Sequence, residues 1–119
     1  MPTKKRQQFI VGVDLGGTNI VVGAMSADGK HHYAMRSVPT SSELGAEGVA
    51  DRIVAVIEGV ILDTIAQTNS NRKDFMGVGI GAPGPLDRDK GLVIVAPNLG
   101  WRNFPLRDRI GERLNLPAT

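Results

Sequence analysis

The sequence predicts an α/β fold in which helices cover a mixed β-sheet. Three short apolar segments between residues 9 and 38 are separated by turns, the pattern of an antiparallel meander. A long segment of helical periodicity follows, and strand-like and helix-like segments then alternate to the end of the chain. We therefore expect three strands, a helix, two strands and a final helix, in that order.

The first strands flank a glycine pair. An apolar run at residues 9–13 precedes Gly16-Gly17, and a second run occupies residues 20–25. Asp28-Gly29 then provides a hairpin turn, because glycine adopts a positive φ without steric cost. The third strand is expected at residues 31–38, where a proline ends it.

Residues 49–65 predict an amphipathic helix, because apolar side chains recur three or four positions apart with charged residues between them. Thr40 and Glu43 have the spacing of a capping box ahead of it. The polar cluster at residues 68–71 is expected to end the helix.

The second half of the chain predicts two strands and one helix. The strands are expected at residues 75–82 and 92–96. Asn103 is expected to cap the final helix, with Pro105 in the first turn, where no N–H is needed. That helix places its apolar side chains four positions apart within residues 106–114.

Composition limits the function classes. The 119 residues suit one domain, and the absence of cysteine excludes a disulfide scaffold or a thiolate zinc site. The same absence fits a cytoplasmic protein. No apolar run approaches the roughly 20 residues of a membrane span. A net charge of +2 with scattered basic residues predicts no nucleic-acid binding, and residues 1–7 are interpreted as a polar tail.

The main candidate for a ligand site is the expected hairpin tip at residues 14–19. Two adjacent glycines let an anion approach the backbone N–H groups, and Thr18 adds a hydroxyl. Asp14, at the end of the first strand, can hold a metal-bound water or orient the loop. From these residues alone, a plain glycine-rich hairpin explains the pattern equally well.

A second glycine-rich segment, residues 79–84, matches G-x-G-x-x-G literally. A dinucleotide site requires this motif to open a helix, and Pro83 and Pro85 oppose one. These glycines are better explained as a flat backbone platform beside a ligand.

Three segments together resemble one family, the ROK family of repressors, open reading frames and sugar kinases. They are Asp14 to Thr18, Gly77 to Pro85, and Ala96 to Trp101, and the likeness extends over residues 9–119. Its bacterial glucokinases are the closest likeness. The resemblance implies a ribonuclease-H-like first domain of the actin-like, hexokinase-like ATPase superfamily. It also implies ATP- and magnesium-dependent phosphorylation of a hexose, glucose above all, at its 6-hydroxyl.

The resemblance also implies roles for the residues of the first loop. Asp14 would lie near the magnesium ion, which it would hold indirectly, and near the transferring phosphate. Gly16, Gly17, Thr18 and Asn19 would surround the phosphates of ATP.

Other residues would contact the sugar. Asn98 would hydrogen-bond a sugar hydroxyl, and the backbone at Gly81 and Ala82 would approach the sugar. From the sequence alone, Asn98 also fits a turn after a proline, and Trp101 fits a core or interface aromatic as well as a pocket wall.

The chain departs from the family in what it lacks. Family members carry an Asn-Asp-Ala element whose Asp is the general base, and no Asn-Asp pair occurs here. The second domain, with its further phosphate loop and frequent zinc cluster, is also missing, so zinc is not expected. Residues 8–119 are therefore interpreted as the N-terminal portion of a kinase domain. Residues 116–119 are interpreted as the start of another strand, so the chain looks truncated and inactive alone.

Alternatives from other functional classes remain. The chain fits a non-catalytic ATP- or sugar-binding module, or a sugar-responsive ROK regulator without its DNA-binding part. Only 13 residues precede Asp14, too few for a helix-turn-helix. Family members are often homo-oligomers, and an unpaired sheet edge predicts self-association of this chain.

Overall fold

The computed structural model describes residues 7–82, 86–87, 90, 92–96 and 101–119. The elements, in chain order, are β1 (Phe9–Leu15), β2 (Asn19–Ser26), β3 (His32–Pro39), the 3-10 helix η1 (Ser42–Leu44), α1 (Gly45–Thr68), the 3-10 helix η2 (Arg72–Asp74), β4 (Phe75–Gly81), β5 (Leu86–Asp87), β6 (Leu92–Ala96), β7 (Trp101–Phe104) and α2 (Leu106–Leu114). The predicted combination of a mixed sheet with helices is confirmed.

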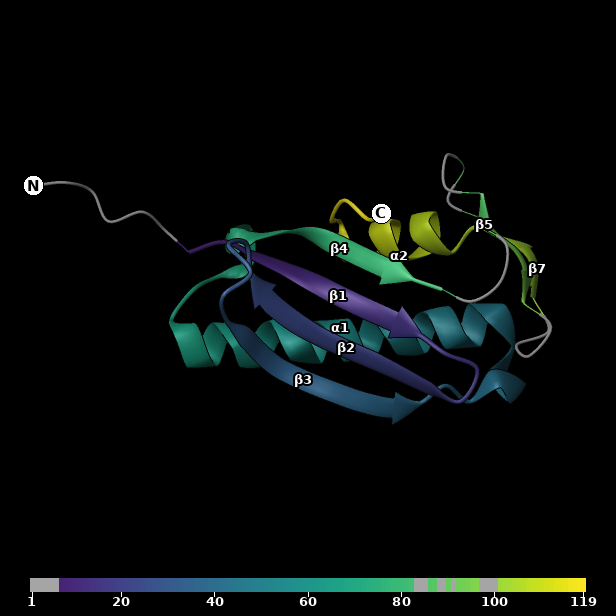
Figure 1. Ribbon diagram of the computed structural model, residues 1–119, viewed down its shortest axis with the longest axis horizontal. Helices are drawn as coiled ribbons and strands as arrows, with labels where there is room; N and C mark the ends of the chain where they lie inside the picture. The colour runs from purple at the N-terminus through teal and green to yellow at the C-terminus, as the bar shows by residue number, and fades with distance from the viewer. Residues whose placement is uncertain (1–6, 83–85, 88–89, 91, 97–100) are drawn as a thin grey trace, which may run out of the picture.

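The main sheet has the strand order β3-β2-β1-β4. The first three strands form the predicted antiparallel meander, and β4 pairs with β1 in parallel. The helix α1 connects β3 to β4 and lies behind the sheet in Figure 1, where the arrowheads of β1 and β4 point the same way. The carboxyl ends of β1 and β4 therefore meet at one end of the sheet.

One core lies between the main sheet and the two helices. Alternate residues of β1, from Phe9 to Leu15, are buried in this core, and the residues between them face the open side of the sheet. Phe9 stacks on Phe75 with ring centroids 5.2 Å apart. As predicted, Leu106, Ile110 and Leu114 of α2 are buried in the same core. No helix in the described ranges has both the length and the apolar character needed to cross a membrane.

Two short strands, β5 and β7, were not predicted. They pair with β6 in a separate three-stranded antiparallel sheet. The prediction that Asn103 caps the last helix is wrong, because Asn103 lies within β7 and Pro105 is the N-cap of α2. Segments of two and four residues carry too few alternations to be recognised as strands, and they form through pairing with β6.

The predicted capping box is also wrong. η1 begins after Ser41, no side chain caps it, and α1 begins at Gly45 rather than near residue 49. Thr40 instead points its hydroxyl at the β1–β2 loop. The end of α1 at Thr68 agrees with the prediction.

The last residues of the chain pair with β4. The Val78 N–H donates to the Pro117 carbonyl, the Thr119 N–H to the Val78 carbonyl, and the Ile80 N–H to the Thr119 carbonyl, each at 2.9 Å. The bridge between Val78 and Ala118 is parallel. Residues 117–119 therefore lie alongside β4 through one isolated bridge, and that they start another strand stays a prediction.

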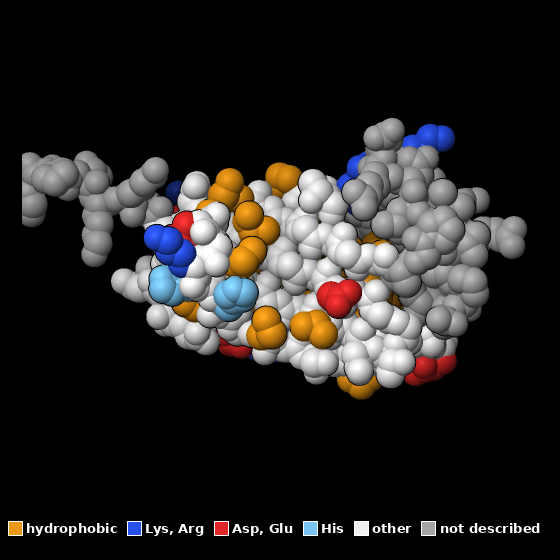
Figure 2. Space-filling model, viewed as in Figure 1, with side chains coloured by type: hydrophobic (Ala, Val, Ile, Leu, Met, Phe, Trp, Pro, Cys, Tyr) orange, Lys and Arg blue, Asp and Glu red, His pale blue; other side chains and the backbone are white. Residues whose placement is uncertain are grey.

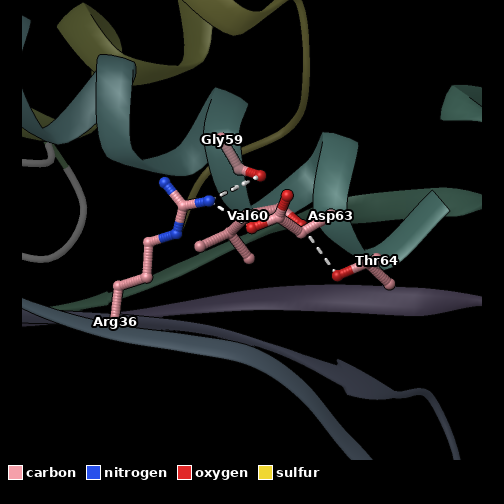
Figure 3. A network of polar contacts seen from close by, with 5 residues as sticks. All are labelled: Arg36, Gly59, Val60, Asp63 and Thr64. Carbon is pink, nitrogen blue, oxygen red and sulfur yellow. Dashed lines mark hydrogen bonds and ion pairs between the residues drawn. The ribbon is translucent and has the colours of Figure 1, made fainter. Parts of the chain in front are cut away.

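A polar contact joins β3 to α1 (Figure 3). Arg36 of β3 forms an ion pair with Asp63 and donates to the Gly59 carbonyl at 3.5 Å. A Cβ at position 59 would meet the Arg36 guanidinium, so glycine makes room for this side chain on the helix. Nearby, the buried Thr64 hydroxyl donates to the Val60 carbonyl at 2.7 Å.

Candidate functional site

The predicted site residue Asp14 lies next to the carboxyl end of β1. In the parallel ladder it is the register partner of Gly81, the last residue of β4. Asp14 is exposed on the open face of the sheet, and no described residue donates a hydrogen bond to its carboxylate. The structure therefore brings Asp14 and Gly81, 67 positions apart in the sequence, to the end of the sheet where open α/β sheets bind ligands.

The loop after Asp14 is a short hairpin tip that closes on itself. The Gly16 N–H donates to the Asn19 carbonyl at 2.9 Å. Gly16 does not adopt a left-handed conformation, but a Cβ there would lie 3.0 Å from the same carbonyl oxygen. A side chain at this position would therefore be crowded by the Asn19 carbonyl, whereas the backbone conformation itself does not require glycine.

The outer side of the loop presents hydrogen-bond donors. Gly17, Thr18 and Asn19 are exposed. The N–H groups of Gly17 and Thr18 donate to no other residue in the described part of the chain. Free, adjacent backbone N–H groups are a common means of binding an anion.

The residue that supports this loop, Thr40, was not among the predicted site residues. Thr40 is 0% exposed, its hydroxyl donates to the Gly16 carbonyl at 2.8 Å, and its N–H donates to the Thr18 carbonyl at 2.8 Å. The contact depends on register, because Pro39 pairs with Asn19 across β2 and β3 and so places Thr40 beside the loop. This contact could be predicted only by aligning β2 with β3 residue by residue and continuing the alignment beyond the ends of the two strands.

The other expected ligand surface is a strip of glycine backbone on the open face. Gly12 pairs with Gly79, and a Cβ built at either would meet no heavy atom within 4 Å. Gly81 is exposed, whereas the Ala82 side chain packs against the core. Gly79 and Gly81 lie in strand β4 and do not open a helix, and their use as a platform beside a ligand stays a prediction.

The structure does not locate every predicted residue. Asn98 and Gly84 lie outside the described residues, and of Trp101 only the backbone, in β7, is described. Figure 1 shows β5 and β7 beyond the arrowheads of β1 and β4, at the same end of the molecule as the Asp14 loop.

Within the described ranges, no cluster of three or more His, Asp or Glu side chains could hold a metal ion. Magnesium ions, however, commonly use only one or two protein carboxylates together with water and phosphate oxygens. The single Asp14 carboxylate, with water and phosphate oxygens as the other ligands, fits that mode.

The pKa of Asp28 is lowered, chiefly by the hydrogen bond from the Ser26 hydroxyl. Asp28, however, lies beyond the opposite end of β2 from Asp14.

Solved structures of other proteins resemble this fold. A ROK family glucokinase from Streptomyces griseus, in complex with glucose and AMPPNP, matches with a TM-score of 0.74 and 33% identity, over 96% of this chain and 32% of that chain. A ROK hexokinase from Thermus thermophilus matches with a TM-score of 0.76 and 33% identity, over 93% of this chain and 34% of that chain. The fold is that of the hexokinase-like ATPases.

The model of the ROK family matches residues 10–119, and the chain belongs to this family. It is 31% identical to a glucokinase from Halalkalibacterium halodurans, over 93% of this chain and 32% of that protein. It is 39% identical to a glucokinase from Thermotoga maritima, over 87% of this chain and 30% of that protein. A xylose repressor from Caldicellulosiruptor bescii is 29% identical, over 92% of this chain and 26% of that protein. The chain spans about a third of the length of the curated relatives it matches.

Proposed function

We propose that this chain is the N-terminal portion of an ATP-dependent hexose kinase that phosphorylates the 6-hydroxyl of its sugar, with glucose as the favoured acceptor. Residues 8–119 would form this portion, after a polar tail at residues 1–7. The observation that carries the proposal is an exposed Asp14 carboxylate beside a loop with free N–H groups, at the carboxyl ends of two parallel strands. The glucokinase relatives support the choice of reaction and sugar.

The loop would contact the phosphates of ATP. The loop presents donors suited to phosphate oxygens: the N–H groups of Gly17 and Thr18, the Thr18 hydroxyl and the Asn19 amide. Gly16 allows the tight turn. Asp14 would hold magnesium through water while the phosphates supply other ligands. Phosphoryl transfer depends mainly on such positioning and charge stabilisation.

The glycine strip would carry one side of the sugar site. Gly81 has no side chain to keep a ring from the backbone, and Ala82 directs its methyl group into the core. Asn98, in the segment between β6 and β7, would bond a sugar hydroxyl, since its amide both donates and accepts.

Nucleotide binding tests this proposal. We expect the 119-residue chain to bind Mg·AMPPNP in calorimetry, and Asp14→Asn to weaken the magnesium-dependent affinity by at least about tenfold, as for loss of a charge-assisted contact. Asp28→Asn removes the same charge at the other end of β2 and should leave the affinity unchanged. Equal affinities for the parent chain and Asp14→Asn would contradict the proposal.

The chain alone should not catalyse the reaction, because the expected general base belongs to an Asn-Asp-Ala element that this sequence lacks. A coupled assay with glucose and Mg·ATP should show no turnover. ATP-dependent glucose phosphorylation by the purified chain would refute this expectation.

A sugar-responsive regulator is the second candidate, favoured by the xylose repressor among the relatives. A regulator must bind sugar but need not transfer phosphate, so it gains nothing from a free carboxylate beside an anion-binding loop. Sugar binding without any affinity for Mg·AMPPNP would favour the regulator over the kinase.

A further inference from the structure

Hydrogen bonds divide the β1–β2 loop into an acceptor side and a donor side. The carbonyl oxygens of Gly16 and Thr18 both accept from Thr40, at 2.8 Å each. The Gly16 N–H is taken by the Asn19 carbonyl. Among the described residues, no acceptor faces the N–H groups of Gly17 and Thr18. Thr40 therefore engages two carbonyls while the donors point outward.

We infer that Thr40 is the positioning residue of this loop, and that it turns the carbonyls inward so that a bound polyphosphate meets only hydrogen-bond donors. The nature of the ligand rests on the proposed function. The physical reason is the sign of the dipoles, since a carbonyl oxygen that turned outward would repel phosphate oxygens where an N–H attracts them.

Thr40 is held from both sides, which suits it to this role. It directly follows β3, whose last residue Pro39 pairs with Asn19 in the sheet. From α1, the Arg52 Nε donates to the Pro39 carbonyl at 2.7 Å. Because Thr40 is fully buried, water cannot take the place of its hydroxyl, and removing it would leave the Gly16 carbonyl without a partner.

The test uses the 119-residue chain and three variants. Thr40→Val keeps the shape and loses the hydroxyl, and Thr40→Ser keeps the hydroxyl. Thr64→Val is the matched control, because Thr64 is also 0% exposed and its hydroxyl also donates to a backbone carbonyl, but within α1. Two quantities are measured: the affinity for Mg·AMPPNP, and the NMR backbone order parameters of Gly16, Gly17 and Thr18 without ligand.

We expect Thr40→Val to lower the affinity by about tenfold, the effect of an unsatisfied buried acceptor, and to lower the order parameters of the loop. Thr40→Ser should keep the affinity and the loop order parameters of the parent chain. Thr64→Val should change neither of these quantities. If Thr40→Val leaves loop order and affinity at parental values, or if Thr64→Val disorders the loop equally, the inference is overturned. If the parent binds no nucleotide, the proposed function fails, and the order parameters still decide the role of Thr40.

Discussion

Asp28 organises the hairpin between β2 and β3 through hydrogen bonds to its carboxylate. The Ser26 hydroxyl donates to Oδ1 at 2.6 Å and the Lys30 N–H donates to the same oxygen at 2.9 Å. These bonds favour the ionised form and hold the pKa of Asp28 below its ordinary value of 3.8. The sequence predicted a turn here from Asp28-Gly29, and Gly29 adopts a φ of 78°.

The stabilising effect of Asp28 should depend on pH. A carboxyl group whose pKa is lowered by folding stabilises the folded state above its unfolded pKa, and this contribution is lost as the pH falls through the folded pKa. We expect Asp28→Ala to be less stable than the parent chain at pH 7, with the difference shrinking below about pH 4. Urea unfolding of both chains at a series of pH values measures this difference in stability.

The control for this prediction is Asp28→Asn, which keeps an acceptor oxygen but does not titrate. The difference in unfolding free energy between Asp28→Asn and Asp28→Ala should be the same at pH 7 and at pH 3, because neither side chain ionises. A constant difference between the parent chain and Asp28→Ala over the whole range would contradict the role assigned to the carboxylate.

At the scale of elements, two glycines of β4 differ in what lies beside them. A Cβ at Gly77 would lie 2.7 Å from the Pro117 carbonyl oxygen, whereas a Cβ at Gly79 would have open space. We expect Gly77→Ala to cost about 1–3 kcal/mol, as overpacking does, by displacing residues 117–119 from β4. Urea unfolding and hydrogen exchange at the Thr119 amide measure the two effects.

Gly79→Ala is the matched control in the same strand. It should change the free energy of unfolding by less than about 1 kcal/mol and leave exchange at Thr119 unchanged. Equal losses in the two variants would show that residues 117–119 do not constrain β4.

The long elements could be predicted because their apolar spacing is set by one core. The spacing of Ile53, Ile57 and Ile61 predicted α1, and all three are fully buried. β5 and β7 could not be predicted, because strands of two and four residues depend on their pairing with β6.

The candidate site likewise contains residues that could be predicted from the sequence and one that could not. Asp14 and Gly16 could be singled out because their chemistry is visible in a short motif, although the test of their roles is nucleotide binding. Thr40 could not, because its contact depends on a hairpin register that brings residues 24 positions apart together.

For the whole molecule, the two faces of the main sheet differ. The helices cover one face, whereas Ile10, Val21 and Met25 are half-buried on the other, beside Met35 at 64% and Met76 at 49% exposure. Figure 2 shows apolar side chains gathered on this open face. β3 is also an edge strand of the sheet. An apolar face next to a free edge favours self-association.

We expect the 119-residue chain to self-associate as its concentration rises. Met35→Lys with Met76→Lys should weaken association by at least about tenfold, since burying a Met side chain contributes about 1.5–3 kcal/mol. Sedimentation velocity over a concentration series measures this. Leu62→Lys is the control, because Leu62 is 65% exposed but lies on α1. A parent chain that sediments as a monomer at every concentration would disprove the expectation.

The pairing of Asp14 with Gly81 has a consequence for the accuracy of folding. Side chains alternate between the faces of a strand, so a shift of β1 by one residue would turn the Asp14 carboxylate into the core and push Val13 and Leu15 into water. Burying an unpaired carboxylate costs several kcal/mol, so misaligned forms are strongly disfavoured. The alternation of side chains that builds the core thus also selects the one register in which the Asp14 carboxylate, on which the proposed chemistry depends, faces solvent.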